Sequence, residues 1–177
     1  MHFALLSAAL CLLAADDKPA MPQTVRHQVT GLFSPDRVDD LREAMVEMPD
    51  IKLISVEYDK AEAVFEYDPA KAFVGAKPDQ VVERFNNTLR GVTRGTFGIK
   101  PLAALPPDKL QRIEISVVGL DCKGCSLGAY EAVYKLDGVE RATASFKTGL
   151  VIALVDPTKT NRAALEEALK QRRVELK

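Results

Sequence analysis

The chain has 177 residues, of which 28% are charged and 47% hydrophobic, and its formal net charge is -1. This composition is typical of a globular protein with room for one ordinary domain or two small ones, and it excludes a disordered or fibrous chain. Trp is absent, aromatic residues make up 6%, and no long basic run is present. We therefore expect neither nucleic-acid binding nor a stacking platform for bases or sugars.

The first 15 residues differ from the rest of the chain. Residues 3–15 are almost wholly apolar and uncharged, and the charged stretch 16–18 ends this run. The run is too short to cross a bilayer as a helix, but it suits the apolar region of an export signal, with Ala14 and Ala15 at the cleavage point. We therefore predict a signal peptide at 1–15, although His2 stands where Lys or Arg is usual. The alternative is a short hydrophobic tail that is retained.

Cleavage would change the cysteine content of the chain. Cys11 would leave with the signal, and the mature chain would keep two cysteines, Cys122 and Cys125. The mature protein would then be periplasmic or secreted and would have no membrane span.

Residues 22–101 show alternating strand and helix patterns. A helix is predicted over 35–48, because apolar residues recur every three or four positions; Ser34 is its expected N-cap and Pro49 its stop. Met45 and Met48 lie on the apolar face of this helix, where core packing is expected rather than a methionine copper site. His27, in the first strand, is expected to be a packed or surface residue rather than a ligand. The other predicted elements are strands at 24–30, 51–58, 63–67 and 97–99 and a helix at 79–90.

The same order of residues recurs 88 positions later. Gly31-Leu32 corresponds to Gly119-Leu120, and Asp68-Pro69 corresponds to Asp156-Pro157, with no gap over 31–69. Such a match predicts an internal duplication. The second copy has predicted strands at 113–118, 139–146, 150–155 and 174–176 and predicted helices at 125–136 and 161–171.

Each copy has the order strand, helix, strand, strand, helix, strand, which is the ferredoxin-like arrangement. We therefore predict an α+β protein of two tandem ferredoxin-like (βαββαβ) modules, at 22–101 and 109–177. Two prolines stiffen the linker at 102–108.

The chemistry of the chain is concentrated in one motif, Gly119-Leu120-Asp121-Cys122-Lys123-Gly124-Cys125, between a predicted strand and a predicted helix. Two thiols with two residues between them can bind one ion when the first lies in the loop and the second begins the helix. The helix N-terminus and the charge of Lys123 are expected to lower the pKa of the thiols, and Gly124 is expected to allow a tight turn between them. In the first copy these thiols are replaced by Ser34 and Arg37.

Two other uses of Cys122 and Cys125 stay open. The pair could form a structural disulfide in an interaction module, or it could cycle between thiol and disulfide in a redox protein. No combination of base, nucleophile and orienting residue is apparent in the sequence, so we do not expect an enzyme.

With this motif, the second copy resembles the heavy-metal-associated domain of copper chaperones, metal-exporting P-type ATPases and exported mercury-binding proteins. The resemblance covers 111–176 and includes Gly138-Val139; Leu120 stands where the family usually has Met. It implies a ferredoxin-like metal-binding module with Cys122 and Cys125 as ligands, preceded by a degenerate copy. Supporting positions on the helix are Ala129, Val133 and Leu136.

Two thiolates alone suit Cu(I), which accepts low coordination, whereas zinc normally takes four ligands. We therefore favour Cu(I), one ion per chain, with Zn(II), Cd(II) and Hg(II) as alternatives. Asp121 is a candidate third ligand, because the family's zinc-, cadmium- and lead-exporting ATPases have a similar Asp; the alternative is that it bonds the loop backbone.

The resemblance also implies partners and supporting charges. Copper chaperones place a Lys before the last strand, and Arg173 lies beside the equivalent position, which is Val174. The expected partner is a metal-transporting membrane protein or another metal acceptor, and we expect the first module to be a docking or spacing element.

Overall fold

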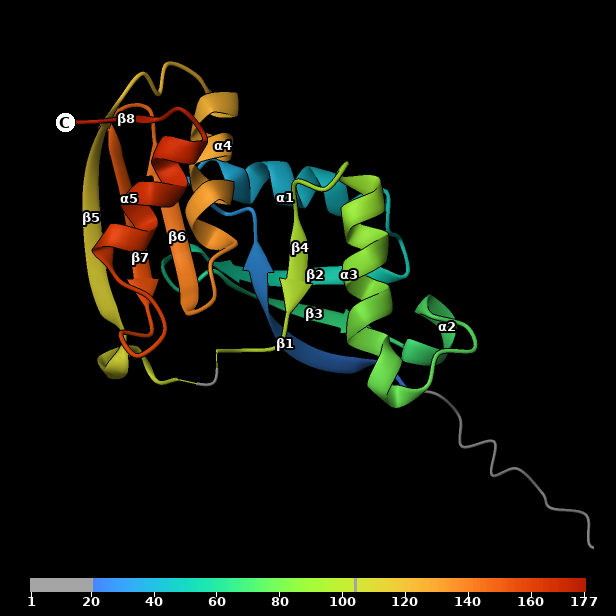
Figure 1. Ribbon diagram of the computed structural model, residues 1–177. Helices are drawn as coiled ribbons and strands as arrows, with labels where there is room; N and C mark the ends of the chain where they lie inside the picture. The colour runs from blue at the N-terminus through green and yellow to red at the C-terminus, as the bar shows by residue number, and fades with distance from the viewer. Residues whose placement is uncertain (1–20, 104) are drawn as a thin grey trace, which may run out of the picture.

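The computed structural model describes residues 21–103 and 105–177, so the predicted signal segment 1–15 lies outside the described residues. The chain forms two four-stranded antiparallel sheets, with strand orders β2-β3-β1-β4 and β6-β7-β5-β8 (Figure 1). Both orders are those of a ferredoxin-like module. The prediction of two tandem ferredoxin-like modules is therefore confirmed.

Apart from the short helix α2 of the first module, the two modules have matching elements in the same order. Those of the first are β1 (Gln23–Thr30), α1 (Arg37–Met45), β2 (Ile51–Glu57), β3 (Glu62–Tyr67), α2 (Pro69–Ala72), α3 (Val81–Val92) and β4 (Gly98–Lys100). Those of the second are β5 (Gln111–Val118), α4 (Lys123–Tyr134), β6 (Val139–Ser145), β7 (Leu150–Val155), α5 (Arg162–Gln171) and β8 (Glu175–Leu176). In the second module α4 and α5 pack side by side on one face of the sheet (Figure 1).

The first helix departs from its predicted bounds. It begins at Arg37 rather than at Pro35, and its N-cap residue is Asp36, whose side chain makes no capping bond. Ser34 was expected to cap the helix, but its hydroxyl donates to the Asp36 carboxylate at 2.6 Å instead. The start of α1 is therefore bonded through the backbone, where the N–H of Arg37 donates to the Ser34 carbonyl at 3.0 Å, and no side-chain cap is formed.

The short helix α2 was not predicted. It follows β3 directly, and the Asp68 carboxylate caps it by accepting the backbone N–H of Ala70 at 3.0 Å. Four residues are too few for the periodicity that identifies longer helices.

The core of the first module lies between its sheet and its helices. Met45 and Met48 are buried in this core, as expected, and so is His27, whose ring lies 5.9 Å from that of Phe85. Burial lowers the pKa of His27 because the charged imidazolium would lose its hydration. His27 is therefore a packed residue.

The core of the second module follows the alternation of its strands. On β5, Ile113, Ile115 and Val117 point inward while their neighbours are exposed. They pack with α4 and with Leu165 and Leu169 of α5. In the described part of the chain, no helix is both long and apolar enough to cross a membrane.

One side chain of the first module belongs to the core of the second. Phe33, in the loop between β1 and α1, is 2% exposed and packs with the second module's core residues. Its ring lies 5.8 Å from that of Tyr130 on α4, and its carbonyl accepts the backbone N–H of Ala144 on the edge strand β6 at 3.0 Å. The Tyr130 hydroxyl accepts the N–H of Gly31 at 2.8 Å. The two modules are therefore joined by a packed contact as well as by the linker.

Further polar contacts join the modules along β6. Gln28 of β1 donates to the Glu140 carbonyl at 2.7 Å, and the Lys100 ammonium lies 3.5 Å from the Glu140 carboxylate. Arg141 donates to the Tyr58 carbonyl at 2.9 Å, and its guanidinium lies over the Tyr58 ring. These bonds cover the outer edge of β6, which would otherwise be free to pair with another strand.

Candidate metal centre

The loop that carries the two cysteines joins β5 to α4. Gly119 has a φ of 76°, a left-handed conformation that glycine adopts without strain and that turns the chain away from the strand. Cys122 is the N-cap residue of α4 and has extended backbone angles, whereas Cys125 lies in the first turn of the helix. The expectation of a special turn at Gly124 is wrong, because Gly124 lies in the helix itself and has no positive φ.

The structure brings together the two predicted sulfur ligands. Both are free thiols, and their Sγ atoms are 2.7 Å apart. The Cys122 sulfur also accepts the backbone N–H of Cys125 at 3.2 Å, so it takes the part that a Ser or Asp oxygen usually has at a helix N-cap. Cys122 is exposed and Cys125 is partly exposed, so an ion held between them would be within reach of an incoming ligand.

The two thiols differ in acidity. The pKa of Cys122 is lowered, first because its sulfur accepts a hydrogen bond from the Cys125 thiol and then because it accepts the Cys125 backbone N–H. The pKa of Cys125 is raised, chiefly because its thiol donates to Cys122. Cys122 is therefore the sulfur that ionises first, and a thiolate is the form that binds metal.

Asp121 is exposed and immediately precedes Cys122. Across the described residues, no three or more His, Cys, Asp or Glu side chains are grouped so that they could hold an ion together. The structure therefore pairs the two cysteines without adding the Asp121 carboxylate as a third ligand, and a role for Asp121 stays a prediction.

Lys123 extends toward the first module. Its Nζ lies 2.7 Å from the Asp36 carboxylate and 3.9 Å from that of Asp40. The carboxylates raise the pKa of Lys123, and Lys123 is the main reason that the pKa of Asp36 falls to about 2. The positive charge expected beside the thiols is therefore paired with a carboxylate from the other copy of the fold.

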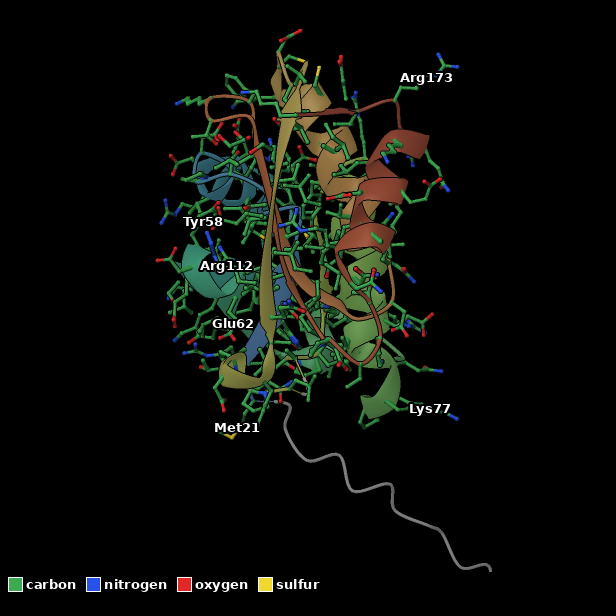
Figure 2. The ribbon with its side chains drawn as sticks, turned by 60° about the vertical axis from the view of Figure 1, so that its left-hand side comes forward. Met21, Tyr58, Glu62, Lys77, Arg112 and Arg173 are labelled. Atoms are coloured by element: carbon green, nitrogen blue, oxygen red, sulfur yellow. The ribbon has the colours of Figure 1, made fainter. Side chains whose placement is uncertain are left out.

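A hollow of about 400 Å³ lies beside the partly exposed thiol, lined by the cysteine loop and by the turn between α5 and β8. Leu120 is buried beneath the loop, as expected for the residue in the family's Met position. Val174 packs against the core, whereas Arg173 has a φ of 60° and extends into solvent (Figure 2). Arg173 and its neighbour Arg172 are thus the cationic residues that the turn presents to the hollow.

The corresponding loop of the first module holds a cation of its own. Arg37, at the position of Cys125, is largely buried, with its guanidinium 5.2 Å from the Phe33 ring centre and 4.7 Å from that of Phe97. The same guanidinium donates to the Asp40 carboxylate. This loop is therefore ordered by a side chain and by its contact with the second module.

The sequence pattern did not identify the residues that the first module places near the cysteine loop. Asp36 and Asp40 fall within the helix predicted over 35–48 and Phe33 precedes it, and no local pattern connects these three with residues some 90 positions further along the chain. The one available signal was the acidic character of 36–40 in a copy that lacks thiols.

Comparisons with known proteins find a curated relative. A stretch of 72 residues, 41% of this chain, is 33% identical to the mercuric transport protein periplasmic component of Shewanella putrefaciens and covers 77% of that protein. No protein-family model matches the chain.

Solved structures with a similar fold were also found. Oxidized MerP from Ralstonia metallidurans CH34 is 25% identical, and the match covers 38% of this chain and 94% of that one with a TM-score of 0.37. The N-terminal soluble domains of Bacillus subtilis CopA are 16% identical, and the match covers 89% of this chain and 94% of that one with a TM-score of 0.36.

Proposed function

The chain belongs to the heavy-metal-associated domain family, and from this premise we propose that its second module binds one soft heavy-metal ion through Cys122 and Cys125. The observation that supports the proposal is the pair of free sulfurs, 2.7 Å apart at the start of a helix. Binding to the neutral thiols releases two protons, one from each sulfur. The lowered pKa of Cys122 makes the first release easier near neutral pH.

Cu(I) is the ion that we favour, because it accepts two thiolates without further ligands. Hg(II) is the second candidate, since the curated relative is a mercuric transport protein and Hg(II) also forms stable complexes with two thiolates. Zn(II) and Cd(II) need more ligands, and Asp121 would supply a third, oxygen ligand for them.

The work of the module is binding and transfer rather than catalysis. A first acceptor thiol approaches the exposed Cys122 side, bonds to the ion and displaces one of the protein's sulfurs, and a second acceptor thiol then displaces the other; each proton that an acceptor thiol gives up is taken up by the cysteine that it releases. The partner is a metal-transporting membrane protein or another metal acceptor. Export to the periplasm or the outside follows from the apolar segment 1–15 and fits the periplasmic relative.

Metal titration tests the proposal directly. We titrate the protein without residues 1–15 with Cu(I), Hg(II) or Zn(II), fully reduced and free of oxygen. Native mass spectrometry then measures the mass of the complex. We expect one ion per chain for the wild type, none at matched concentrations for Cys122→Ser or Cys125→Ser, and one for Ser34→Ala, the matched position of the first module. If the wild type binds none of the three ions, the proposal is wrong.

A further variant distinguishes whether Asp121 binds the ion or supports the loop. Asp121→Ala should lose affinity for Zn(II) and Cd(II) while it keeps Cu(I), because only the divalent ions need the carboxylate. Equal loss for all ions would mean that Asp121 supports the loop rather than the ion.

A thiol–disulfide redox function is the rival, supported by the short distance between the sulfurs and by the acidity of Cys122. In that case the protein would show a reversible reduction potential and activity in a disulfide-exchange assay, and would fail to retain ions. A protein that shows neither property would be an interaction module in which the two cysteines form a structural disulfide.

A further inference from the structure

The first module brings two carboxylates to the cysteine loop of the second. Lys123 lies between the two thiols in sequence, and its ammonium meets Asp36 at 2.7 Å and Asp40 at 3.9 Å. Both partners lie at the start of α1, which the duplication relates to the start of α4. The thiol-free loop of one copy thus contacts the thiol-bearing loop of the other.

These carboxylates are held in place by packed neighbours. The Ser34 hydroxyl donates to Asp36, and the guanidinium of Arg37 donates to Asp40. Arg37 in turn lies between two aromatic rings, one of which is the ring of Phe33 that is buried in the second module. Asp36 and Asp40 are therefore fixed relative to the cysteine loop.

We infer that Asp36 and Asp40 are specificity-determining residues, which shift the ion preference of the Cys122–Cys125 site from monovalent toward divalent soft ions. The inference rests on the proposed function. Asp36 pairs with Lys123 and so neutralises the ammonium next to the thiols, and Asp40, which also pairs with Arg37, places a second carboxylate near that ammonium.

The complexes of the two kinds of ion differ in net charge. A Cu(I) ion between two thiolates leaves a net charge of -1, whereas a divalent ion between the same thiolates leaves no net charge. Replacing the divalent ion by Cu(I) breaks two metal–sulfur bonds and forms two, moves no proton and no electron, and makes the site more negative by one unit. Nearby carboxylates oppose this replacement and a free ammonium favours it.

The test compares the Cu(I) to Zn(II) affinity ratio of matched variants, measured by competition with a chromophoric chelator for each ion. Asp36→Asn removes the charge but keeps an oxygen that can accept the Ser34 hydroxyl. For charges on the order of 10 Å apart near a surface, we expect the ratio to rise roughly three- to tenfold. Asp40→Asn, whose carboxylate is farther from Lys123, should give a smaller rise.

The control is Asp39→Asn on the same helix. Its side chain is 81% exposed and pairs with Arg42 at 2.7 Å, away from Lys123, so the ratio should stay at the wild-type value. The rise in Asp36→Asn should shrink at high salt, which screens charges at this distance. It should also shrink in a Lys123→Gln background, because no ammonium is then released.

The outcomes are distinguishable. A wild type that binds none of Cu(I), Hg(II) and Zn(II) overturns the proposed function and this inference together, whereas one that binds Hg(II) but neither Cu(I) nor Zn(II) overturns this inference alone. A wild type that binds, with the same ratio in Asp36→Asn, Asp40→Asn and Asp39→Asn, overturns this inference alone. Thermal melting of each variant shows whether the fold is kept, and an altered ratio that follows loss of stability rather than loss of charge also refutes the inference.

Discussion

Replacing Phe33 by Ala should destabilise the second module, although Phe33 lies in the first module in sequence. The ring is 2% exposed and lies among the core residues of the second module, against Tyr130. Truncating a buried Phe costs about 3–5 kcal/mol, through lost burial and through the cavity that remains. For a chain of this size, each kcal/mol lowers the melting temperature by about 2–4 °C. We therefore expect a fall on the order of 10 °C.

Hydrogen exchange shows which part of the protein loses stability. In Phe33→Ala, amides of β5 and β6 should exchange faster than in the wild type, although the substitution lies in the first module. The N–H of Ala144, which donates to the Phe33 carbonyl, is a direct reporter. Phe73→Ala is the matched control, since Phe73 is 5% exposed and packs only within the core of the first module.

One pattern of hydrogen exchange would contradict this prediction for Phe33. If Phe33→Ala speeds exchange only between 23 and 67 and leaves β5 and β6 as protected as in Phe73→Ala, then Phe33 stabilises its own module. The second module would then fold independently of the first.

Three further outcomes follow from the structure. A Cβ at Gly31 would clash with the backbone oxygen of Thr96, so Gly31→Ala should be markedly destabilising in urea unfolding. Gly119 has open space around it but a φ of 76°, so Gly119→Ala should cost about 1 kcal/mol of unfolding free energy. Cys122 should react with iodoacetamide before the other thiol of the pair, because its pKa is lowered and that of its neighbour is raised; equal labelling by mass spectrometry would contradict this. The pKa of Asp36 falls from 3.8 to about 2 on folding, so its ion pair stabilises the protein above pH 4 and is lost as the pH falls toward 2; Lys123→Met should flatten this acid-side loss in unfolding titrations, and an unchanged slope would argue against the pair.

Much of the fold could be predicted because the duplication shows the same pattern twice. Gly31 and Gly119 have positive φ angles at matching positions, and each is followed by a buried Leu. Inward-facing residues alternate along β5 and recur every three or four positions along α5, and these periods are local properties of the sequence. The cysteine pair could be predicted for the same reason, since its spacing and its place before a helix are local.

The contact between the modules could not be predicted. Phe33 follows a glycine turn, and its sequence neighbours do not show which of two cores will bury its ring. Lys123 was expected to act on the thiols beside it, whereas the structure pairs it with Asp36. Both contacts depend on how the two complete modules pack against each other. The hydrophobic periodicity of either module alone carries no information about that packing.

Arg37 gives the first loop an internal cation at the position where the second loop carries the Cys125 thiol. Its guanidinium is covalently attached to the chain, so the contacts that order the first loop need no bound ion. Restoring thiols at 34 and 37 would remove the guanidinium between the rings and the hydroxyl that holds Asp36. Under the proposed function, a second ion would be gained only by loosening the contact between the modules, so added metal capacity would reduce internal rigidity.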